Sequence, residues 1–458
     1  MLHGPPTSSR GTASALLGGI LTLALVFSGC DRPAGMGGPD DAAARGTAAG
    51  APTGSPLPTA APEEVGMSSE RLTRLHDGMQ ALVDDGRLAG ITTMIARGGR
   101  TVDFQTYGFR DLEAEDPVEE DAIFRIYSMS KPVTGVALMT LYEEGKFQLD
   151  DPVEDYIPEF EGLMVAEDWG PDGPELVEAD HPMTIRELMT HTSGLAYGIG
   201  APGPVDSLYA ARGVLSRDQT LEDMIAKLAD IPLRHQPGTQ WYYSISVDVQ
   251  GYLVEVLSGQ PFDEFLEERI FGPLGMVDTG FHVPEEDHDR FVQYYDYDDE
   301  GVLVPSPGTD GEVGSRPYLD PTTFFSGGGG LVSTTTDYMR FSQMLLNGGE
   351  LDGVRILSPT TVEMMHNDQL AEGISGPGQG RGFGLDFAVV TGPFPSAVYR
   401  SDGEYSWGGA AGTWFWIDPV EELIFVGMIQ QRGDPMRPNV SGLARQLTYQ
   451  AIVDSLAE

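Results

Sequence analysis

The chain has 458 residues, of which 40% are hydrophobic, so it is long enough to bury a large core. Its 70 acidic residues against 27 basic ones give a net charge of −43, which argues against binding to nucleic acids or anionic membrane surfaces, because both require clustered cations. Its single cysteine, Cys30, excludes an intramolecular disulfide and any cysteine nucleophile or cysteine-based zinc site further along the chain.

The first thirty residues have the pattern of an export signal. Arg10 precedes an apolar run over 15–27 that is too short for a comfortable membrane span. Ser28 and Gly29 stand directly before Cys30 and resemble a bacterial lipobox, in which the cysteine becomes lipidated. We therefore predict a lipoprotein-type signal peptide over 1–30. The protein is then exported, periplasmic or on the cell surface, with its only membrane contact through the lipid on Cys30; ordinary signal cleavage is the alternative.

Two further segments follow the signal. Residues 31–62 are rich in Ala, Gly, Pro and Thr and lack hydrophobic periodicity, which predicts a flexible linker. Residues 63–458 form the predicted folded domain. Its first helix begins at Ser68 or Ser69 and ends at Gly86.

Strands are predicted near both ends of the folded domain. At the start they cover 91–96 and 102–107; at the end they cover 413–417 and 423–430, before a last helix over 441–456. Between them, a helix begins near Ser128 and stops at Gly145, and residues 121–318 have a mainly helical pattern. This order predicts an α/β (α+β) fold. One antiparallel sheet is built from the two ends of the domain, flanked by helices and interrupted by a mainly helical subdomain.

A Ser-x-x-Lys motif opens the helix near Ser128. Residues three apart share one face of a helix, so the Lys131 amine can reach the Ser128 hydroxyl. The helix N-terminus also offers free N–H groups to an oxyanion on Ser128. For Lys131 to act as the base it must be neutral, so we expect burial and positive potential to lower its pKa.

The surrounding residues 124–135 resemble the nucleophile segment of the β-lactamase-related serine hydrolases. This superfamily includes class C β-lactamases, D,D-peptidases and the esterases of carboxylesterase family VIII. The resemblance continues through 149–153 and 156–160, through the block Thr-His-Thr-Ser-Gly-Leu at 190–195, and through a glycine-rich block at 325–333. It spans residues 63 to 456, and it implies the β-lactamase/D,D-peptidase-like version of the predicted fold.

The resemblance also implies a second and a third site motif. The family's Tyr-x-Asn appears here with Tyr243 as the tyrosine and Ile245 in place of asparagine, while Tyr242 is a rival for Tyr243. The family's Lys-Thr-Gly strand corresponds to a segment that begins at Trp407, so the cation that binds a substrate carboxylate is replaced by an apolar wall. Tyr243 would share proton transfer with Lys131.

Several residues are expected to bind the substrate. The backbone N–H groups of Ser128 and Ala410 would form the oxyanion hole. The predicted substrate-binding residues are Ser128, Ile245, Trp407, Gly408, Gly409 and Ala410.

These motifs predict a serine hydrolase that forms an acyl-enzyme on Ser128, with a small ester or amide as substrate and without a cofactor. The first interpretation is a carboxylesterase acting on small or short-chain esters, closest in its motifs to family VIII. A second is a β-lactamase or D,D-peptidase, in which Arg400 or Arg432 replaces the missing lysine. A third is a penicillin-recognising sensor or a scaffold lipoprotein without turnover.

Two other features have simpler interpretations. His191 belongs to the Thr-His-Thr-Ser-Gly block and is expected to be a structural, hydrogen-bonded histidine, because the chain has no Gly-x-Ser-x-Gly nucleophile elbow. The acidic stretch 294–301 lacks the spacing of an EF-hand and predicts a solvated loop rather than a calcium site. Histidine and carboxylate spacing indicates no metal site.

Overall fold

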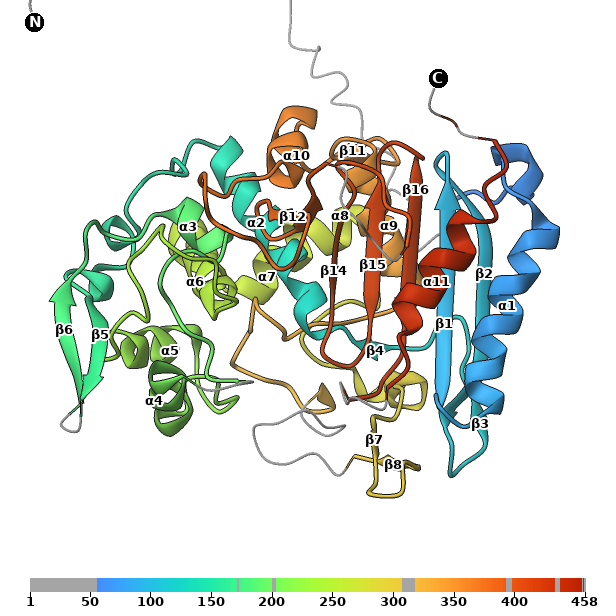
Figure 1. Cartoon of the computed structure of the whole chain (residues 1–458), viewed down its shortest axis with the longest axis horizontal. Helices are drawn as coiled ribbons and strands as arrows, with labels where there is room; N and C mark the ends of the chain where they lie inside the picture. The colour runs from blue at the N-terminus through green and yellow to red at the C-terminus, as the bar shows by residue number, and fades with distance from the viewer. Residues whose placement is uncertain are drawn as a thin grey trace, which may run out of the picture. The chain divides into compact units, whose positions relative to one another are not determined.

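A computed structural model describes residues 56–456, apart from 171–172, 200–202, 307–317, 393–397, 433–436 and 455. Its main feature within these ranges is an eight-stranded antiparallel sheet in the order β12-β13-β14-β15-β16-β1-β2-β3 (Figure 1). The strands are β1 (Gly90–Arg97), β2 (Arg100–Asp111), β3 (Asp116–Pro117), β12 (Arg381–Phe383), β13 (Ala388–Val390), β14 (Tyr405–Gly408), β15 (Trp414–Asp418) and β16 (Leu423–Met428). Strand β1 pairs with β16, so strands from the two ends of the domain meet, as the sequence predicts.

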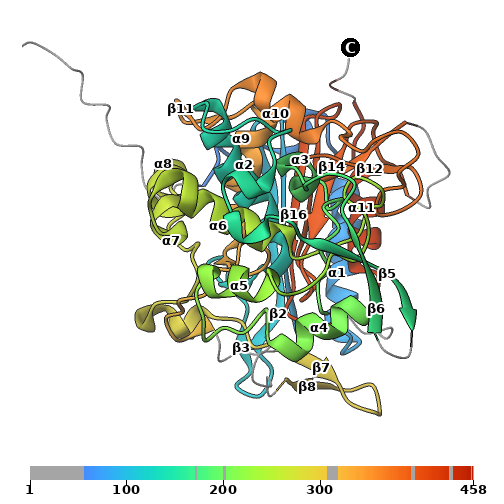
Figure 2. The same cartoon turned by 90° about the vertical axis from the view of Figure 1, so that its left-hand side faces the viewer.

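Helices cover both faces of the sheet (Figures 1 and 2). On one face, α1 (Ser69–Asp84) and α11 (Val440–Tyr449) enclose a core with the alternate residues Leu423 and Phe425 of β16. On the other face, α2 (Ser130–Glu143) and α9 (Thr335–Leu346) enclose the larger core with Ile424 and Val426. All six residues of β16 are buried, because a strand covered on both faces alternates between two apolar cores.

The middle of the chain is mainly helical, as predicted, and includes short hairpins. The helices are α3 (Ile185–Met189), α4 (Pro204–Arg212), α5 (Leu221–Leu228), α6 (Ser246–Ser258), α7 (Phe262–Leu266) and α8 (Gly272–Leu274), with α10 (Pro359–His366) later in the chain. The two-stranded pairs are β4 (Phe124–Arg125) with β9 (Val332–Ser333), β5 (Met164–Gly170) with β6 (Gly173–Glu178), β7 (Tyr295–Tyr297) with β8 (Leu303–Pro305), and β10 (Glu350–Leu351) with β11 (Val354–Arg355). Most residues of β5 and β6 are exposed or half-buried, so the sequence lacks the apolar alternation that would reveal them.

Three details of the predicted elements differ from the structure. The last helix ends at Tyr449 rather than at 456, because Ile452 leaves the helix to form a bridge with Met67. The acidic stretch 294–301 includes β7 and its turn, so it is part of a hairpin and not only a loop. Packing begins before the predicted end of the linker, since Leu57 is buried. The signal peptide over 1–30, the lipidated Cys30 and the linker up to residue 55 lie outside the described residues.

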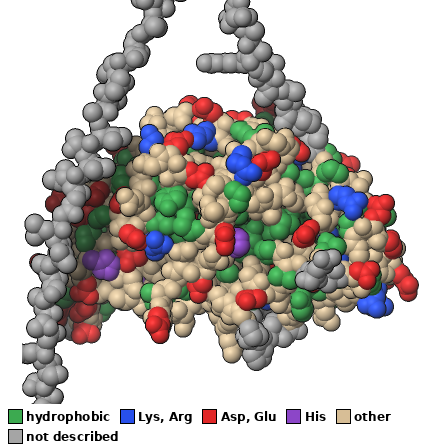
Figure 3. Space-filling view, turned by 90° about the horizontal axis from the view of Figure 1, so that it is seen from above, with side chains coloured by type: hydrophobic (Ala, Val, Ile, Leu, Met, Phe, Trp, Pro, Cys, Tyr) green, Lys and Arg blue, Asp and Glu red, His purple; other side chains and the backbone are tan. Residues whose placement is uncertain are grey.

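The surface carries the acidic excess of the composition. On the face in Figure 3, acidic side chains are spread widely among fewer basic ones. Arg290 illustrates the imbalance, since its guanidinium forms ion pairs with three aspartates at once: Asp121, Asp278 and Asp287. Among the described helices, none has the length and apolar character needed to cross a membrane.

A buried carboxyl at the start of α9 is expected to make stability depend on pH. Asp337 accepts hydrogen bonds from the Asp278 N–H (2.8 Å) and the Thr279 hydroxyl (2.9 Å), yet burial raises its pKa to about 7. The stability from such a raised pKa is complete below the unfolded value of about 4 and is lost as the pH rises through about 7. Between pH 5 and pH 8, the free energy of unfolding of the wild type should therefore fall by about 1–3 kcal/mol relative to that of Asp337→Asn, which cannot titrate at this position. Denaturant titrations at both pH values measure this change, and an unchanged difference would contradict it.

Candidate active site

The predicted nucleophile lies on a short turn that leads into α2. Ser128 is the central residue of the 3₁₀ turn η2 (Tyr127–Met129) and is half-buried. Tyr127 before it has φ = +42°, a left-handed conformation that is rare and costly for a residue other than glycine. Met129 after it is buried in the main core. The chain therefore holds the half-buried Ser128 immediately before a buried helix, at the helix start that the sequence predicts.

Lys131 lies one turn further along α2, and its side chain is only 1% exposed. Its Nζ is 3.4 Å from the Ser128 Oγ, in the arrangement that the three-residue spacing predicts. The same amine donates hydrogen bonds to the Gly328 carbonyl (2.6 Å) and to the Tyr197 hydroxyl (3.1 Å). The amine is thus fixed by three oxygens in a place closed to water.

The predicted lowering of the Lys131 pKa is wrong. Burial alone lowers the pKa of this amine, but Tyr197, Tyr243 and Asp248 outweigh burial and raise the pKa above its usual range. The physical reason is that oxygen acceptors and a carboxylate surround the amine, and all of them favour its charged form. Lys131 is therefore an ammonium in the resting site.

The structure distinguishes Tyr243 from its rival Tyr242. The Tyr243 ring centroid lies 4.6 Å from the Lys131 Nζ, and its hydroxyl accepts a hydrogen bond from Trp407 Nε1 at 3.4 Å. The Tyr242 hydroxyl instead donates to the buried carboxylate of Asp206. Of the two neighbours, only Tyr243 faces the Lys131 amine, which matches the position that the family resemblance assigns to it.

Tyr197 is a site residue that the sequence analysis missed. Its hydroxyl contacts the Lys131 amine, and its ring packs edge-on against Tyr243 with centroids 5.2 Å apart. Burial raises the Tyr197 pKa, and the Lys131 charge opposes that shift. Sequence alone places Tyr197 only six residues after His191 and offers no signal that separates it from an ordinary core aromatic.

His191 has the surroundings of a structural histidine, as expected. Its Nδ1 is 3.0 Å from the Ser244 hydroxyl, and its ring packs against Trp241, Tyr243 and Phe383. Burial, and then the charge of Lys131, hold the His191 pKa well below its usual range. The ring is therefore neutral and supports the aromatic residues around the site.

The turn of the third motif packs against the nucleophile segment. Strand β14 ends at Gly408, and Gly409 follows it. A Cβ on Gly409 would lie 2.4 Å from the Ile126 carbonyl oxygen, so only glycine allows this approach. The Thr413 hydroxyl donates to that same carbonyl at 3.3 Å. These contacts bring the exposed turn that carries Ala410 next to the segment that carries Ser128, as an oxyanion hole between them requires.

An aromatic wall includes Trp407, the residue at which the family resemblance places the start of the third motif. The half-buried Trp407 packs against Tyr243, with ring centroids 5.4 Å apart, and edge-on against Phe383 at 5.5 Å. Trp241 stacks against Tyr243 on the other side. The side of the site next to Tyr243 is therefore apolar, as the sequence analysis expects for Trp407.

The prediction that Ile245 contacts the substrate is corrected. Its side chain is 0% exposed and belongs to the main core, and its N–H donates to the Ala196 carbonyl at the start of α6. A side chain without exposed surface cannot form part of an open wall. Ile245 therefore contributes packing at the position where the family's asparagine would face the substrate.

Two arginines were candidates to replace the missing cation. Arg400 is 2.9 Å from the buried carboxylate of Glu404, which also binds Arg445. Arg432 is 62% exposed and lies 4.0 Å from Asp296. Arg400 is thus held by a buried carboxylate, whereas Arg432 makes only a long, exposed ion pair.

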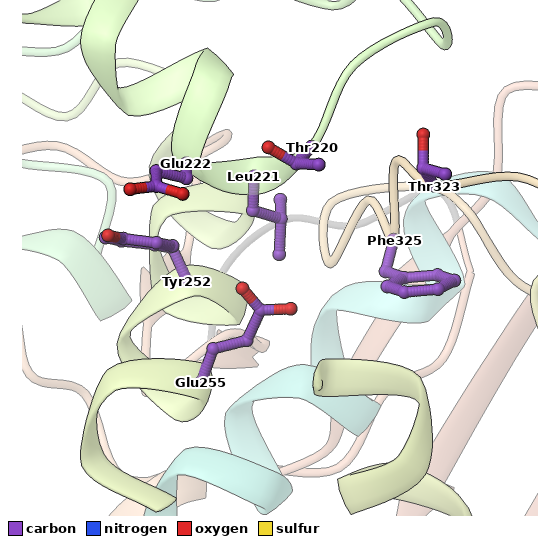
Figure 4. Close-up of a pocket in the computed structure, with 7 residues that line it drawn as sticks. All are labelled: Thr220, Leu221, Glu222, Tyr252, Glu255, Thr323 and Phe325. Carbon is purple, nitrogen blue, oxygen red and sulfur yellow. The ribbon is translucent and has the colours of Figure 1, made fainter. Parts of the chain in front are cut away.

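A separate hollow of about 350 Å³ lies beside α5 and α6 (Figure 4). It is lined by Thr220, Leu221, Glu222, Tyr252, Glu255, Thr323 and Phe325. Ser128, Lys131 and Tyr243 do not line it, so it is not the predicted acyl site.

Comparisons with known proteins show what the chain as a whole is similar to. Residues 75–449 match the family model described as Beta-lactamase. The chain is 39% identical over 376 residues to Protein Rv1367c of Mycobacterium tuberculosis, covering 78% of this chain and 90% of that protein. It is 34% identical over 373 residues to Esterase EstB of Burkholderia gladioli, with 78% and 89% covered. The solved structure of EstCE1, a hydrolase with promiscuous acyltransferase activity, is similar with a TM-score of 0.72 and 28% identity, and 83% of this chain and 99% of that chain are covered.

Proposed function

The chain belongs to the Beta-lactamase family and is a serine hydrolase, and on that premise we propose that it is a carboxylesterase acting on neutral, short-chain esters. The observation that carries the proposal is the aromatic wall at Trp407, which stands where the family has a lysine for the substrate's carboxylate. An apolar wall favours a neutral substrate, because it offers a buried carboxylate no partner. The similarity to Esterase EstB supports an esterase.

The reaction begins with attack of the Ser128 Oγ on the ester carbonyl carbon. Because Lys131 is an ammonium at rest, we infer that it stabilises Tyr243 as a phenolate in the reacting form of the enzyme, and this phenolate oxygen accepts the serine proton. The backbone N–H groups of Ser128 and Ala410 hold the oxyanion of the tetrahedral intermediate. That intermediate collapses to an acyl-enzyme as the alkoxide takes the proton from Tyr243 and leaves as an alcohol.

Deacylation repeats these steps with water as the nucleophile. Tyr243 accepts a proton from the attacking water, the Ser128–acyl bond breaks, and the proton returns to the Ser128 oxygen. The products are a carboxylic acid and the free enzyme. Slow deacylation would instead leave a sensor that acylates without turnover.

The β-lactamase or D,D-peptidase alternative differs in one requirement. Those substrates carry a carboxylate, but Arg400 is bound by the buried Glu404 and Arg432 is mostly exposed to solvent. The geometry therefore favours the esterase over this alternative.

A substrate panel tests the proposal. We expect kcat/KM for p-nitrophenyl acetate and butyrate to exceed that for nitrocefin and for an ester with a free carboxylate by at least about tenfold, which corresponds to about 1.4 kcal/mol. In Trp407→Lys the ratio should move toward the anionic substrates, while Trp407→Phe serves as the matched apolar control. Dominant turnover of nitrocefin by the wild type would assign a β-lactamase, and stoichiometric acylation without turnover would assign a sensor.

A further inference from the structure

A buried carboxylate that none of the three motifs contains is connected to Lys131 through one glycine. Asp248 lies in the first turn of α6 and is 1% exposed. Its carboxylate accepts hydrogen bonds from the Ser326 hydroxyl (2.5 Å) and the Gly328 N–H (3.2 Å). The carbonyl of that same Gly328 accepts the hydrogen bond from the Lys131 amine. A single residue of the glycine-rich block thus bridges the carboxylate and the ammonium.

Steric contacts hold the glycine turn in place. A Cβ on Gly328 would lie 2.4 Å from an Asp248 carboxylate oxygen, so the carboxylate packs directly against the glycine backbone. Gly327 is held from the side of α2, where the Thr134 hydroxyl donates to its carbonyl at 2.9 Å. The Gly328 carbonyl, which accepts the hydrogen bond from the Lys131 amine, therefore lies in a turn that contacts both α2 and α6.

Five groups that can titrate interact with the Lys131 amine: His191, Tyr197, Tyr243, Asp248 and Asp386. Burial and the Lys131 charge keep His191 neutral, and burial raises the pKa of Asp386 well above its usual range, so it stays protonated. Burial also raises the Asp248 pKa, but Lys131, the Ser326 hydroxyl and backbone N–H groups oppose that shift. Of these five groups, Asp248 is the one that shares Gly328 with the Lys131 amine, since its carboxylate accepts the Gly328 N–H while the amine donates to the Gly328 carbonyl.

We propose that Asp248 is a positioning residue for the reaction: through Gly328 it orients the Lys131 ammonium, and as its buried counter-charge it keeps that amine protonated. The proposal rests on the proposed acyl-enzyme chemistry at Ser128. It goes beyond that chemistry because it assigns the charge state of the lysine to a residue that does not touch the substrate. Without Asp248 the amine would lose its proton at a lower pH and would hold its direction less tightly.

The test follows the reactivity of Ser128 across pH with a fluorophosphonate probe, because labelling requires an activated serine but no particular ester. Rates are measured from pH 6 to pH 11 for wild type, Asp248→Asn and Asp337→Asn. Asp337 is a matched control, since it is also a buried aspartate but is not among the groups that interact with Lys131. We expect wild type and Asp337→Asn to keep their labelling rate up to the alkaline end of this range, and Asp248→Asn to show an alkaline fall that begins at least about one pH unit lower.

Each outcome of this experiment decides a separate point. An unshifted alkaline limb in a folded Asp248→Asn protein overturns the proposal, even if the rate falls uniformly, because a uniform loss is what a structural role produces. Absence of labelling in the wild type would instead refute Ser128 as the nucleophile and with it the proposed function. If Asp248→Asn does not fold, Ser326→Ala replaces it, since removing this donor weakens the carboxylate charge and should shift the limb in the same direction by a smaller amount.

Discussion

Ser128→Ala is expected to lower kcat for p-nitrophenyl butyrate by about 10⁴-fold or more, because it removes the only nucleophile that the proposed acyl-enzyme uses. The fold should be preserved, since Ser128 is half-buried and its hydroxyl interacts with the Lys131 amine at 3.4 Å, a weak contact. Steady-state kinetics measure the loss, and mass spectrometry of a fluorophosphonate-treated sample should find the adduct on Ser128 in the wild type and none in the variant.

Ser130→Ala is the matched control for this experiment. Ser130 lies two residues away on α2, but its hydroxyl oxygen accepts the Leu331 N–H at 3.1 Å and is fully buried. We expect this variant to lose about 1–2 kcal/mol of stability while keeping its adduct at Ser128. Activity that survives in Ser128→Ala, or an adduct that forms at another serine, would refute the assignment of the nucleophile.

Lys131→Met is expected to lower kcat by about 10³-fold or more at every pH, because methionine has nearly the same length but cannot donate a proton or stabilise charge on Tyr243. The variant leaves the Gly328 carbonyl and the Asp248 carboxylate without their cation, so it should also lower the melting temperature. Kinetics over pH 6 to 10 and thermal unfolding measure the two effects.

Lys227→Met separates the two effects. The Lys227 amine is partly buried and donates to Gln219 (2.5 Å) and to the Gly213 carbonyl (3.1 Å), away from the three motifs. This variant should lose stability and keep kcat within about twofold, as expected for a structural contact remote from the chemistry. If Lys131→Met retained wild-type kcat, Lys131 would have no part in the proton transfer.

The fold could be predicted from the sequence wherever the apolar pattern is strong. Strand β16 is a continuous apolar segment and β1 is a fully buried strand near the opposite end of the domain, and their pairing follows from burying both in one sheet. The edge strand β12 and its neighbour β13 were missed, since each is only three residues long and leaves too few positions to show alternation.

The sequence by itself determined the parts of the site that depend on local spacing. Ser128 and Lys131 lie three residues apart at a helix start, so any helix there brings hydroxyl and amine together. Gly409 belongs to the glycine-containing segment after Trp407, which the sequence alone assigns to the third motif. The export signal ending at Cys30 remains a prediction that rests on sequence alone.

The tertiary structure decided the charge and the surroundings of these groups. Tyr197 lies 66 residues from Lys131 in the chain and contacts its amine directly. Asp248 lies 117 residues away and acts on the amine electrostatically and through Gly328, and no sequence periodicity connects either residue to Lys131. Their oxygens reverse the pKa shift that burial alone predicts for the amine. The position of Ile245 was likewise set by packing, which turned its side chain into the core. Electrostatics and packing act through space, so a linear pattern can place a lysine beside a serine but cannot say which charge that lysine carries.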